Sequence, residues 1–294
     1  MAAMAAWRLR LFFLLLAASC AIACAQPRVL HQRATPYGDL YVTEEAPGVR
    51  TLRFRLDGAR QSVVDLRDPD HLELAYTRLA LAGAALVPAP RRILLAGLGG
   101  GSLPRFLHRK FPEARVEVVE INPQVLEVAT QYLGFTRDAR LVVHIADARD
   151  FIARAPAGAY DLIVLDAYAD ATVPPHLATL EFMGAVRRAL APSGVVVSNL
   201  WNRANNKRYD DMLATQRAAF ASVATLTVPS EVNVIVLSTP RAMRLDREAL
   251  AASAAAVGAA RELRFDLAAM VRDGYFIDAR RGRVLRDTSA LAPQ

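Results

Sequence analysis

Hydrophobic residues in the middle of the chain gather in short runs, and segments with helical spacing lie between these runs. The runs have the length of buried strands, and the segments carry apolar residues three or four positions apart. Because strands and helices alternate, we predict a doubly wound α/β fold with a mostly parallel sheet covered on both faces. The predicted strands are residues 93–96, 116–120, 141–145, 160–166 and 194–200, and the predicted helices are residues 103–111, 123–133, 180–190 and 209–223.

The segment before this region has a different pattern. Apolar and polar residues alternate over residues 39–43 and 49–56, and Asp57 and Gly58 form a turn before the next apolar run. This alternation predicts a small antiparallel β sheet ahead of the main sheet. A helical pattern over residues 72–86 then leads to Pro88, which ends it.

The segment after the last predicted parallel strand also changes character. Residues 226–228 and 232–237 are short apolar runs joined by a turn, which predicts a terminal antiparallel hairpin. The alanine-rich residues 246–260 predict a helix that covers the domain.

The first 25 residues have the anatomy of a secretory signal peptide: two arginines, an apolar run, and small residues at Ala23 and Ala25. The run is about 15 residues long, which is short for a membrane span of roughly 20. Two alternatives stay open, lipidation of Cys24 and a start codon farther downstream. We expect export to the periplasm, or a cytoplasmic protein if translation starts downstream. Membrane contact is expected only through an uncleaved or lipidated N-terminal segment.

These patterns divide the chain into four parts. We assign residues 1–25 to the signal peptide, 26–70 to the small β sheet, 71–240 to a Rossmann-like domain, and 241–294 to a C-terminal helical extension and tail.

Composition and charge exclude several classes of protein. The 294 residues are 53% hydrophobic and 22% charged, which indicates a globular chain rather than a disordered one. The net charge of +7 falls to +5 without Arg8 and Arg10, and no dense basic run with aromatic residues remains, so we expect no nucleic-acid partner. The only cysteines are Cys20 and Cys24, and the histidines lack metal-ligand spacing, so we expect no metal site. We interpret His176 as a packed or capping residue.

A glycine-rich turn follows the first predicted parallel strand. Gly97, Gly99 and Gly101 lie between this strand and a helix, where residues without Cβ allow positive φ and let a ligand approach the backbone. The turn differs from the dinucleotide pattern G-x-G-x-x-G because Ser102 occupies its last position. The tighter spacing favours a nucleoside-binding domain of the S-adenosylmethionine type.

Acidic residues follow three of the predicted parallel strands. Glu120, Asp147 and Asp166 lie at or just beyond the carboxyl ends of their strands. In open parallel sheets ligands bind at that edge, and a carboxylate about 20 residues after a glycine turn can accept hydrogen bonds from ribose hydroxyls. We therefore expect these acids and the glycine turn to form one site.

The chain resembles the spermidine synthase (polyamine aminopropyltransferase) family over residues 37–237. The features that carry the resemblance are Leu56-Asp57-Gly58, Gln61, Tyr76, the turn over residues 97–101, Glu120, Asp147-Ala148 and the strand over residues 160–166. The resemblance implies a fold of the class I methyltransferase type. It also implies no tightly bound cofactor, with decarboxylated S-adenosylmethionine, or S-adenosylmethionine itself, as co-substrate and a small amine as acceptor.

The resemblance also implies roles for individual residues. Glu120 would hold the ribose, Asp147 would accept from the adenine amino group, and Gln61 would help to enclose the donor. Asp166 with Tyr76 would take up the proton of the attacking amine, because a protonated alkylamine has no free lone pair. The residues expected at the donor are Gln61, Gly97, Gly99, Gly101, Glu120, Asp147 and Ala148.

The chain differs from the family's pattern at several positions. Where the family has a Tyr-Gln pair early in the small sheet, Tyr37 is followed by Gly38. The family's G-G-G-D-G-G motif corresponds to residues 97–102, where Gly100 replaces the acid that contacts the donor's amino tail and should repel the carboxylate of intact S-adenosylmethionine. The residues after Tyr76 include Arg78, which becomes a candidate to line the pocket. The second acid of the family's D-S-S-D-P is Asp170, one position later. These changes leave the pocket less acidic than a polyamine should favour.

Three functions from different classes remain open. The first is aminopropyl transfer to an amine, as in polyamine biosynthesis. The second is methyl transfer from intact S-adenosylmethionine, which Gly100 favours. The third is an exported, non-catalytic nucleoside-binding domain, because the donor is made in the cytosol. A dehydrogenase is a distant fourth, and a homodimer stays open.

Overall fold

The structure is a computed structural model that describes residues 27–290, except for residues 88, 169–171 and 230. The predicted signal peptide and Asp170 lie outside the described residues. No helix in the described part of the chain is long and apolar enough to cross a membrane.

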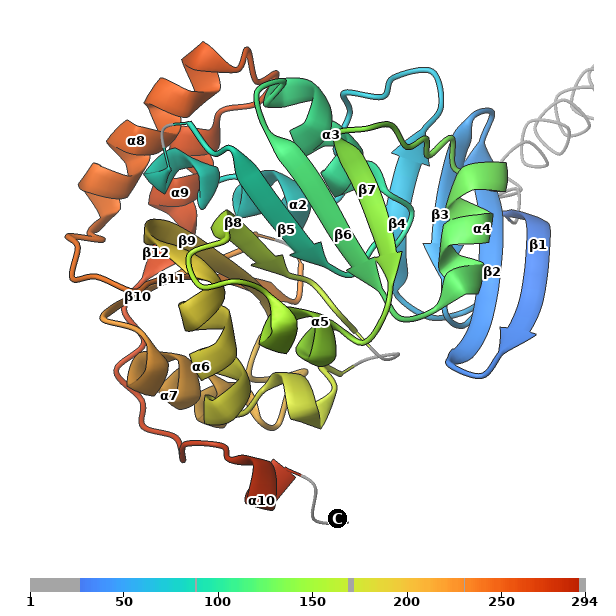
Figure 1. The fold of residues 1–294 in the computed structure, drawn as a ribbon. Coiled ribbons are helices and arrows are strands. Elements are labelled where there is room, and N and C mark those ends of the chain that lie inside the picture. Colours follow the sequence, from blue (N-terminus) through green and yellow to red (C-terminus); the bar gives the residue numbers. More distant parts are fainter. Residues whose placement is uncertain (1–26, 88, 169–171, 230, 291–294) are drawn as a thin grey trace, which may run out of the picture.

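The centre of the molecule is an eight-stranded sheet with the order β12-β10-β11-β9-β8-β5-β6-β7 (Figure 1). The five strands from β9 to β7 are parallel, and β11, β10 and β12 continue the sheet in antiparallel fashion. The predicted doubly wound α/β fold with a terminal hairpin is therefore confirmed. Its strands are β5 (Arg92–Ala96), β6 (Arg115–Glu120), β7 (Leu141–Ile145), β8 (Tyr160–Leu165), β9 (Leu190–Trp201), β10 (Ser222–Thr227), β11 (Asn233–Thr239) and β12 (Tyr275–Phe276).

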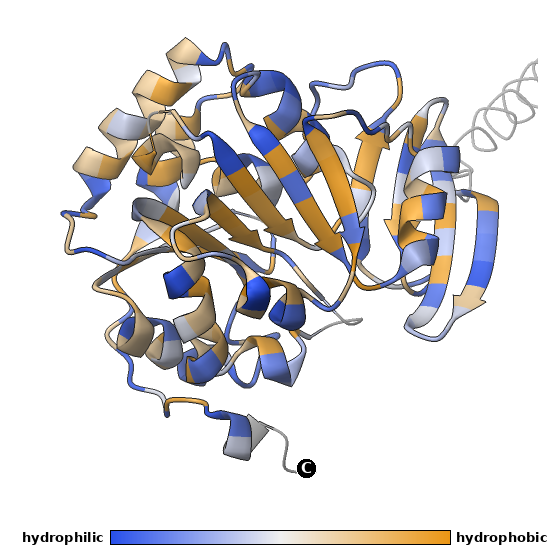
Figure 2. Ribbon diagram, in the orientation of Figure 1, coloured by the Kyte–Doolittle hydropathy of each residue, from blue (hydrophilic) through white to orange (hydrophobic). Residues whose placement is uncertain are grey.

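Successive residues of the central strands bury their side chains on opposite faces of the sheet. In β5, Ile93 and Leu95 belong to one hydrophobic core, whereas Leu94 and Ala96 belong to another. Figure 2 shows β5 as hydrophobic along most of its length. A strand buried on both faces needs helices on both sides, which is why the apolar runs are nearly continuous.

Helices cover both faces. Helices α2, α3, α4, α8 and α9 contribute to the first core, and α5 and α6 contribute to the second, while α7 packs over β9 and β11 (Figure 1). Their bounds are α2 (Ala75–Ala80), α3 (Ser102–Lys110), α4 (Pro123–Tyr132), α5 (Ala148–Arg154), α6 (Leu180–Ala189), α7 (Tyr209–Ala219), α8 (Arg247–Ala260) and α9 (Leu267–Gly274), with short 3-10 helices η1 (Ala84–Leu86) and η2 (Pro175–Leu177) and a final α10 (Asp287–Ala290).

A separate antiparallel sheet, also predicted, precedes the large one. Its order is β1-β2-β3-β4, and polar contacts fix it to helices α4 and α3 of the main domain: Arg50 Nη1 donates to the carbonyl of Tyr132 at 2.6 Å, and the hydroxyls of Ser62 and Ser102 lie 3.2 Å apart. The strands are β1 (Arg28–Thr35), β2 (Gly38–Ala46), β3 (Val49–Arg53) and β4 (Arg60–Asp65).

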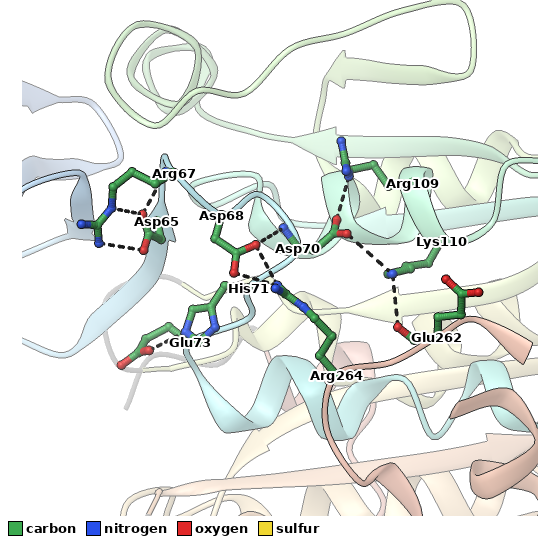
Figure 3. Close-up of polar contacts among 10 residues, drawn as sticks. All are labelled: Asp65, Arg67, Asp68, Asp70, His71, Glu73, Arg109, Lys110, Glu262 and Arg264. Carbon is green, nitrogen blue, oxygen red and sulfur yellow. Dashed lines mark hydrogen bonds and ion pairs between the residues drawn. The ribbon is translucent and has the colours of Figure 1, made fainter. Parts of the chain in front are cut away.

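Ion pairs fix the link between β4 and α2 to the rest of the molecule (Figure 3). Asp68 accepts two hydrogen bonds from Arg264, at 2.7 and 2.8 Å, and Asp70 accepts one from Arg109 at 2.7 Å. Arg109 belongs to α3 and Arg264 to the segment between α8 and α9. Elements distant in sequence therefore position both β4 and α2.

Some helical predictions were too long. The helix predicted over residues 72–86 is divided into α2 and η1, with Gly83 pressed against the sheet: a Cβ there would lie 2.1 Å from Val197 Cγ2. The helix predicted to end at Val223 ends at Ala219, because Ser222 and Val223 already pair with β11. Helices α5, α9 and α10 and strand β12 had not been predicted.

Candidate active site

A cavity of about 600 Å³ opens at the carboxyl ends of the parallel strands, with part of the small sheet as its wall. All but one of the predicted site residues line it. The exception is Gly101, which stands at the beginning of α3 with φ +77 and faces Phe135: a Cβ there would lie 2.3 Å from that ring. The predicted residues that line the cavity are Gln61, Tyr76, Gly97, Gly99, Glu120, Asp147, Ala148 and Asp166.

The glycine turn connects β5 to α3 and passes very close to the end of β8. Gly97 has φ +102, and a Cβ on it would lie 2.3 Å from the backbone carbonyl oxygen of Asp166. Gly99 has φ +53, a value that residues with a Cβ rarely adopt. The glycines therefore bring the turn and the Asp166 backbone together at the floor of the cavity.

Glu120 ends β6 and is held by backbone donors. The amide of Leu98 donates to Oε2 at 3.0 Å, and the amide of Asn122 donates to Oε1 at 2.9 Å. The residue is only 8% exposed, and this burial raises the pKa of the Glu120 carboxyl, while the backbone donors oppose the rise. The carboxylate is thus fixed in orientation at the cavity wall, where its remaining lone pairs can accept from a diol.

Asp147 caps the beginning of α5 and also reaches the cavity. Its Oδ1 accepts from the amides of Arg149 at 2.7 Å and Asp150 at 3.2 Å. Its Oδ2 lies 3.0 Å from Nε2 of His176, which belongs to η2 and lines the cavity too. His176 was predicted as a packed or capping residue, and the structure shows it beside a predicted binding residue.

Asp166 follows β8 and forms the centre of a polar network. The hydroxyl of Tyr76 donates to Oδ2 at 3.2 Å, and Asn199 Nδ2 donates to Oδ1 at 2.8 Å. Asn199 in turn accepts from Asn233 Nδ2 at 2.8 Å. These side chains come from α2, β9 and β11, so the antiparallel hairpin supports the site at the end of the parallel strands.

The network also sets which group holds the proton. Burial raises the pKa of the Asp166 carboxyl, and the hydrogen bonds from Asn199 and Tyr76 oppose that rise. Burial and the adjacent Asp166 charge raise the pKa of Tyr76 well above its usual value. Tyr76 therefore remains a donor, and Asp166 is the group that can accept a proton.

Two aromatic side chains line the cavity beside the Asp166 network. The rings of Tyr168 and Trp201 stack with their centroids 5.6 Å apart, and the Tyr168 hydroxyl donates to the carbonyl of Asn199 at 3.1 Å. Glu231 lines the cavity, but its two oxygens accept from the amides of Ala75 and Tyr76 at 2.7 and 3.0 Å. Sequence analysis did not identify these residues. For Asn199, which sequence analysis also missed, the available signal was a polar residue near the end of a predicted apolar strand.

The departures from the family's pattern have structural counterparts. A Cβ on Gly100 would lie 2.8 Å from Ser62 Oγ and 3.0 Å from Leu133 Cδ1, so these side chains occupy the space beside the turn. Arg78 was a candidate to line the pocket, but among the described residues the arginine that lines it is Arg60. Arg60 comes from β4 and lies 3.7 Å from a carboxylate oxygen of Glu73.

Comparison with known proteins agrees with this geometry. A model of the spermine/spermidine synthase domain matches residues 73–240. A polyamine aminopropyltransferase of Vibrio vulnificus is 34% identical over 255 residues, which cover 83% of this chain and 84% of the relative.

Two solved structures have the same fold. A probable spermidine synthase from Corynebacterium glutamicum has a TM-score of 0.67 at 21% identity, covering 76% of this chain and 86% of that one. Human methyltransferase-like protein 13, in complex with SAH, has a TM-score of 0.56 at 31% identity, covering 70% of this chain and 96% of that one. On the domain match and the Vibrio relative, this chain belongs to the spermine/spermidine synthase family of transferases.

Proposed function

We propose that the protein transfers an aminopropyl group from decarboxylated S-adenosylmethionine to a small amine. The observation that carries this proposal is the partly buried Asp166 carboxylate, held by Tyr76 and Asn199 where the glycine turn meets the end of β8. The relationship to a polyamine aminopropyltransferase over most of both chains supports the same reaction.

The donor fits along the edge of the sheet. Glu120 at the end of β6 would accept from the ribose hydroxyls, and Asp147 after β7 would accept from the adenine amino group. The sulfonium would then lie over the glycine turn near Asp166, where a carboxylate favours positive charge. A relative that was solved with SAH, which carries the same nucleoside, supports an adenosyl donor.

The chemistry follows from the position of Asp166. The acceptor amine arrives protonated, and its proton passes to the Asp166 carboxylate, which frees the nitrogen lone pair. The nitrogen attacks the propyl carbon next to the sulfonium, a carbon–nitrogen bond forms, and the carbon–sulfur bond breaks. The bonding electrons return to sulfur, so neutral methylthioadenosine leaves.

Calorimetry with three ligands tests the donor. We expect the purified protein to bind methylthioadenosine and decarboxylated S-adenosylmethionine, and Asp147→Ala to weaken both by about tenfold because one hydrogen bond to the base is lost. Binding of intact S-adenosylmethionine as tightly as its decarboxylated form would count against aminopropyl transfer. Absence of binding by all three ligands would refute donor binding altogether.

Methyl transfer is the second candidate function. The observation that favours it is Gly100, because the turn lacks the carboxylate that would bind the donor's amino tail and repel the carboxylate of intact S-adenosylmethionine. The similarity to a human methyltransferase-like protein points the same way. Either reaction uses the same adenosyl site and differs in the group on sulfur.

Gly100→Asp tests how the turn selects the donor. The new carboxylate should raise the preference for the decarboxylated donor over the intact one by about tenfold, since it attracts an ammonium and repels a carboxylate. The variant should also lose stability, because its Cβ would be 2.8 Å from Ser62 Oγ. Adding Ser62→Gly should relieve that contact and recover part of the stability, while the 3.0 Å approach to Leu133 Cδ1 remains. An unchanged donor preference in the stable double variant would show that the donor tail does not approach residue 100.

A further inference from the structure

We propose that His176 is a specificity-determining residue for the donor's base, and that the C-terminal segment positions it through Arg149 and Asp287. This inference rests on the proposed adenosyl donor and adds a mechanism for selecting adenine. Its elements are η2, the first turn of α5, and the chain that leads into α10, whose first residue is Asp287.

His176 orients the Asp147 carboxylate. Oδ1 of Asp147 is used by two backbone amides of α5, so only Oδ2 is left for a ligand. His176 Nε2 lies 3.0 Å from this Oδ2, and because a carboxylate only accepts, the ring donates through Nε2. The bond uses one lone pair of Oδ2 and prevents rotation, so that the other is available to an amino group in the cavity.

Arg149 ties the backbone of His176 to the C-terminal segment. Its Nη1 donates to the His176 carbonyl at 2.8 Å and to Thr179 Oγ1 at 3.2 Å. The same guanidinium pairs with both oxygens of Asp287, at 2.9 and 2.5 Å. A planar guanidinium held by a bidentate partner has a fixed direction. Arg149 is therefore a rigid connection between η2 and residue 287.

The C-terminal segment is itself anchored to the domain. Leu285 is buried, its amide donates to Thr215 Oγ1 at 2.9 Å, and its carbonyl accepts from the amide of Leu180 at 2.8 Å. The amide of Asp287 donates to Glu181 at 3.1 Å. These contacts hold Asp287 against α6 and α7, more than 100 residues from His176 in sequence. The segment thus acts as a strap over η2.

The selected feature is the amino group of adenine. A carboxylate accepts from that group but repels the carbonyl oxygen of a 6-oxo purine. A fixed Oδ2 discriminates between these bases, whereas a freely rotating carboxylate can turn away from the carbonyl. His176 should therefore change the ratio of the affinities for the adenine and the 6-oxo purine nucleosides. It should leave the contacts to the ribose, which the two nucleosides share, unchanged.

The experiment compares calorimetric affinities of the full chain for methylthioadenosine and methylthioinosine. Wild type should prefer the adenine compound by about tenfold or more, which is the effect of one buried hydrogen bond. His176→Ala should reduce that preference to about twofold, and His176→Gln, which can still donate to Asp147, should restore most of it. Asp287→Ala should reduce the preference in the wild-type background and have no further effect in the His176→Ala background.

Two variants control for general damage. His108→Ala removes another histidine–carboxylate pair, 3.1 Å from Asp138, and Arg283→Ala removes an exposed cation of the strap; both should keep the wild-type preference. If wild type binds neither nucleoside, the proposed function fails. If wild type prefers adenine and His176→Ala keeps that preference, the role of His176 is overturned. Additive effects of Asp287→Ala and His176→Ala would overturn the claim that the C-terminal segment positions His176.

Discussion

Asp166→Asn is expected to lower kcat by about 10²–10⁴-fold while leaving the affinity for methylthioadenosine within about twofold, because the loss is that of a general base. The amide oxygen can still accept from Asn199, and the amide nitrogen can donate to the Tyr76 hydroxyl oxygen, but the amide cannot accept the amine's proton. Steady-state kinetics and calorimetry on the same preparation separate the two effects.

The pH dependence gives a second measure of the same residue. A base acts in its deprotonated form, so a raised pKa of Asp166 means that kcat falls on acidification at a pH above the ordinary range of aspartate. The control is Asp161→Asn, at the opposite end of β8 from Asp166, where the carboxylate accepts from the amides of Arg91 and Arg92. Equal losses in kcat for both variants would contradict the assignment of Asp166.

Gly97→Ala is expected to reduce donor affinity by at least about 100-fold and to destabilise the fold by several kcal/mol, in the range of about 2–5. Alanine at φ +102 is strained, and its Cβ would lie 2.3 Å from the carbonyl oxygen of Asp166. The carbonyl oxygen of Asp166 is a backbone atom and cannot rotate away as a side chain could. The glycine turn and the end of β8 must therefore move apart. Denaturant unfolding measures the stability, and calorimetry with methylthioadenosine measures the site.

The matched control is Gly184→Ala in α6. A Cβ there would meet nothing within 4 Å, and alanine is the better helix former, so stability should stay the same or rise by up to about 1 kcal/mol. Wild-type donor affinity in Gly97→Ala would show that the close approach of the turn to Asp166 is not needed for binding.

The strands and the acids at their ends could be predicted because their causes are local. Residues 141–145 are mostly apolar and follow a polar residue, and β7 has the same bounds. Parallel strands end at one edge of a sheet, so Glu120 and Asp166 had to lie near each other once the strand–helix alternation was recognised. Gly97 was predictable because an apolar run that stops at glycine needs a turn.

The remaining features depend on tertiary contacts. Ser222 continues a helical pattern, and only its pairing with Thr239 makes it a strand residue. The pattern over residues 72–86 gives no sign that Gly83 packs against Val197 and interrupts the helix. Asn199 became visible as a site residue only when β9 was placed beside β8.

The relation of His176 to Asp147 is a further example. A lone histidine after two prolines is compatible with packing or capping, and 28 residues separate the pair in the chain. Only the return of η2 to the beginning of α5 brings Nε2 within 3.0 Å of the carboxylate.

Identification of the reaction products decides between the candidate reactions. The purified protein is incubated with decarboxylated or intact S-adenosylmethionine and a panel of monoamines and diamines, and the products are identified by mass spectrometry. We predict an acceptor heavier by one aminopropyl group, formed with an equal amount of methylthioadenosine and lost in Asp166→Asn. A methylated acceptor formed with S-adenosylhomocysteine, or no product from either donor, would contradict aminopropyl transfer.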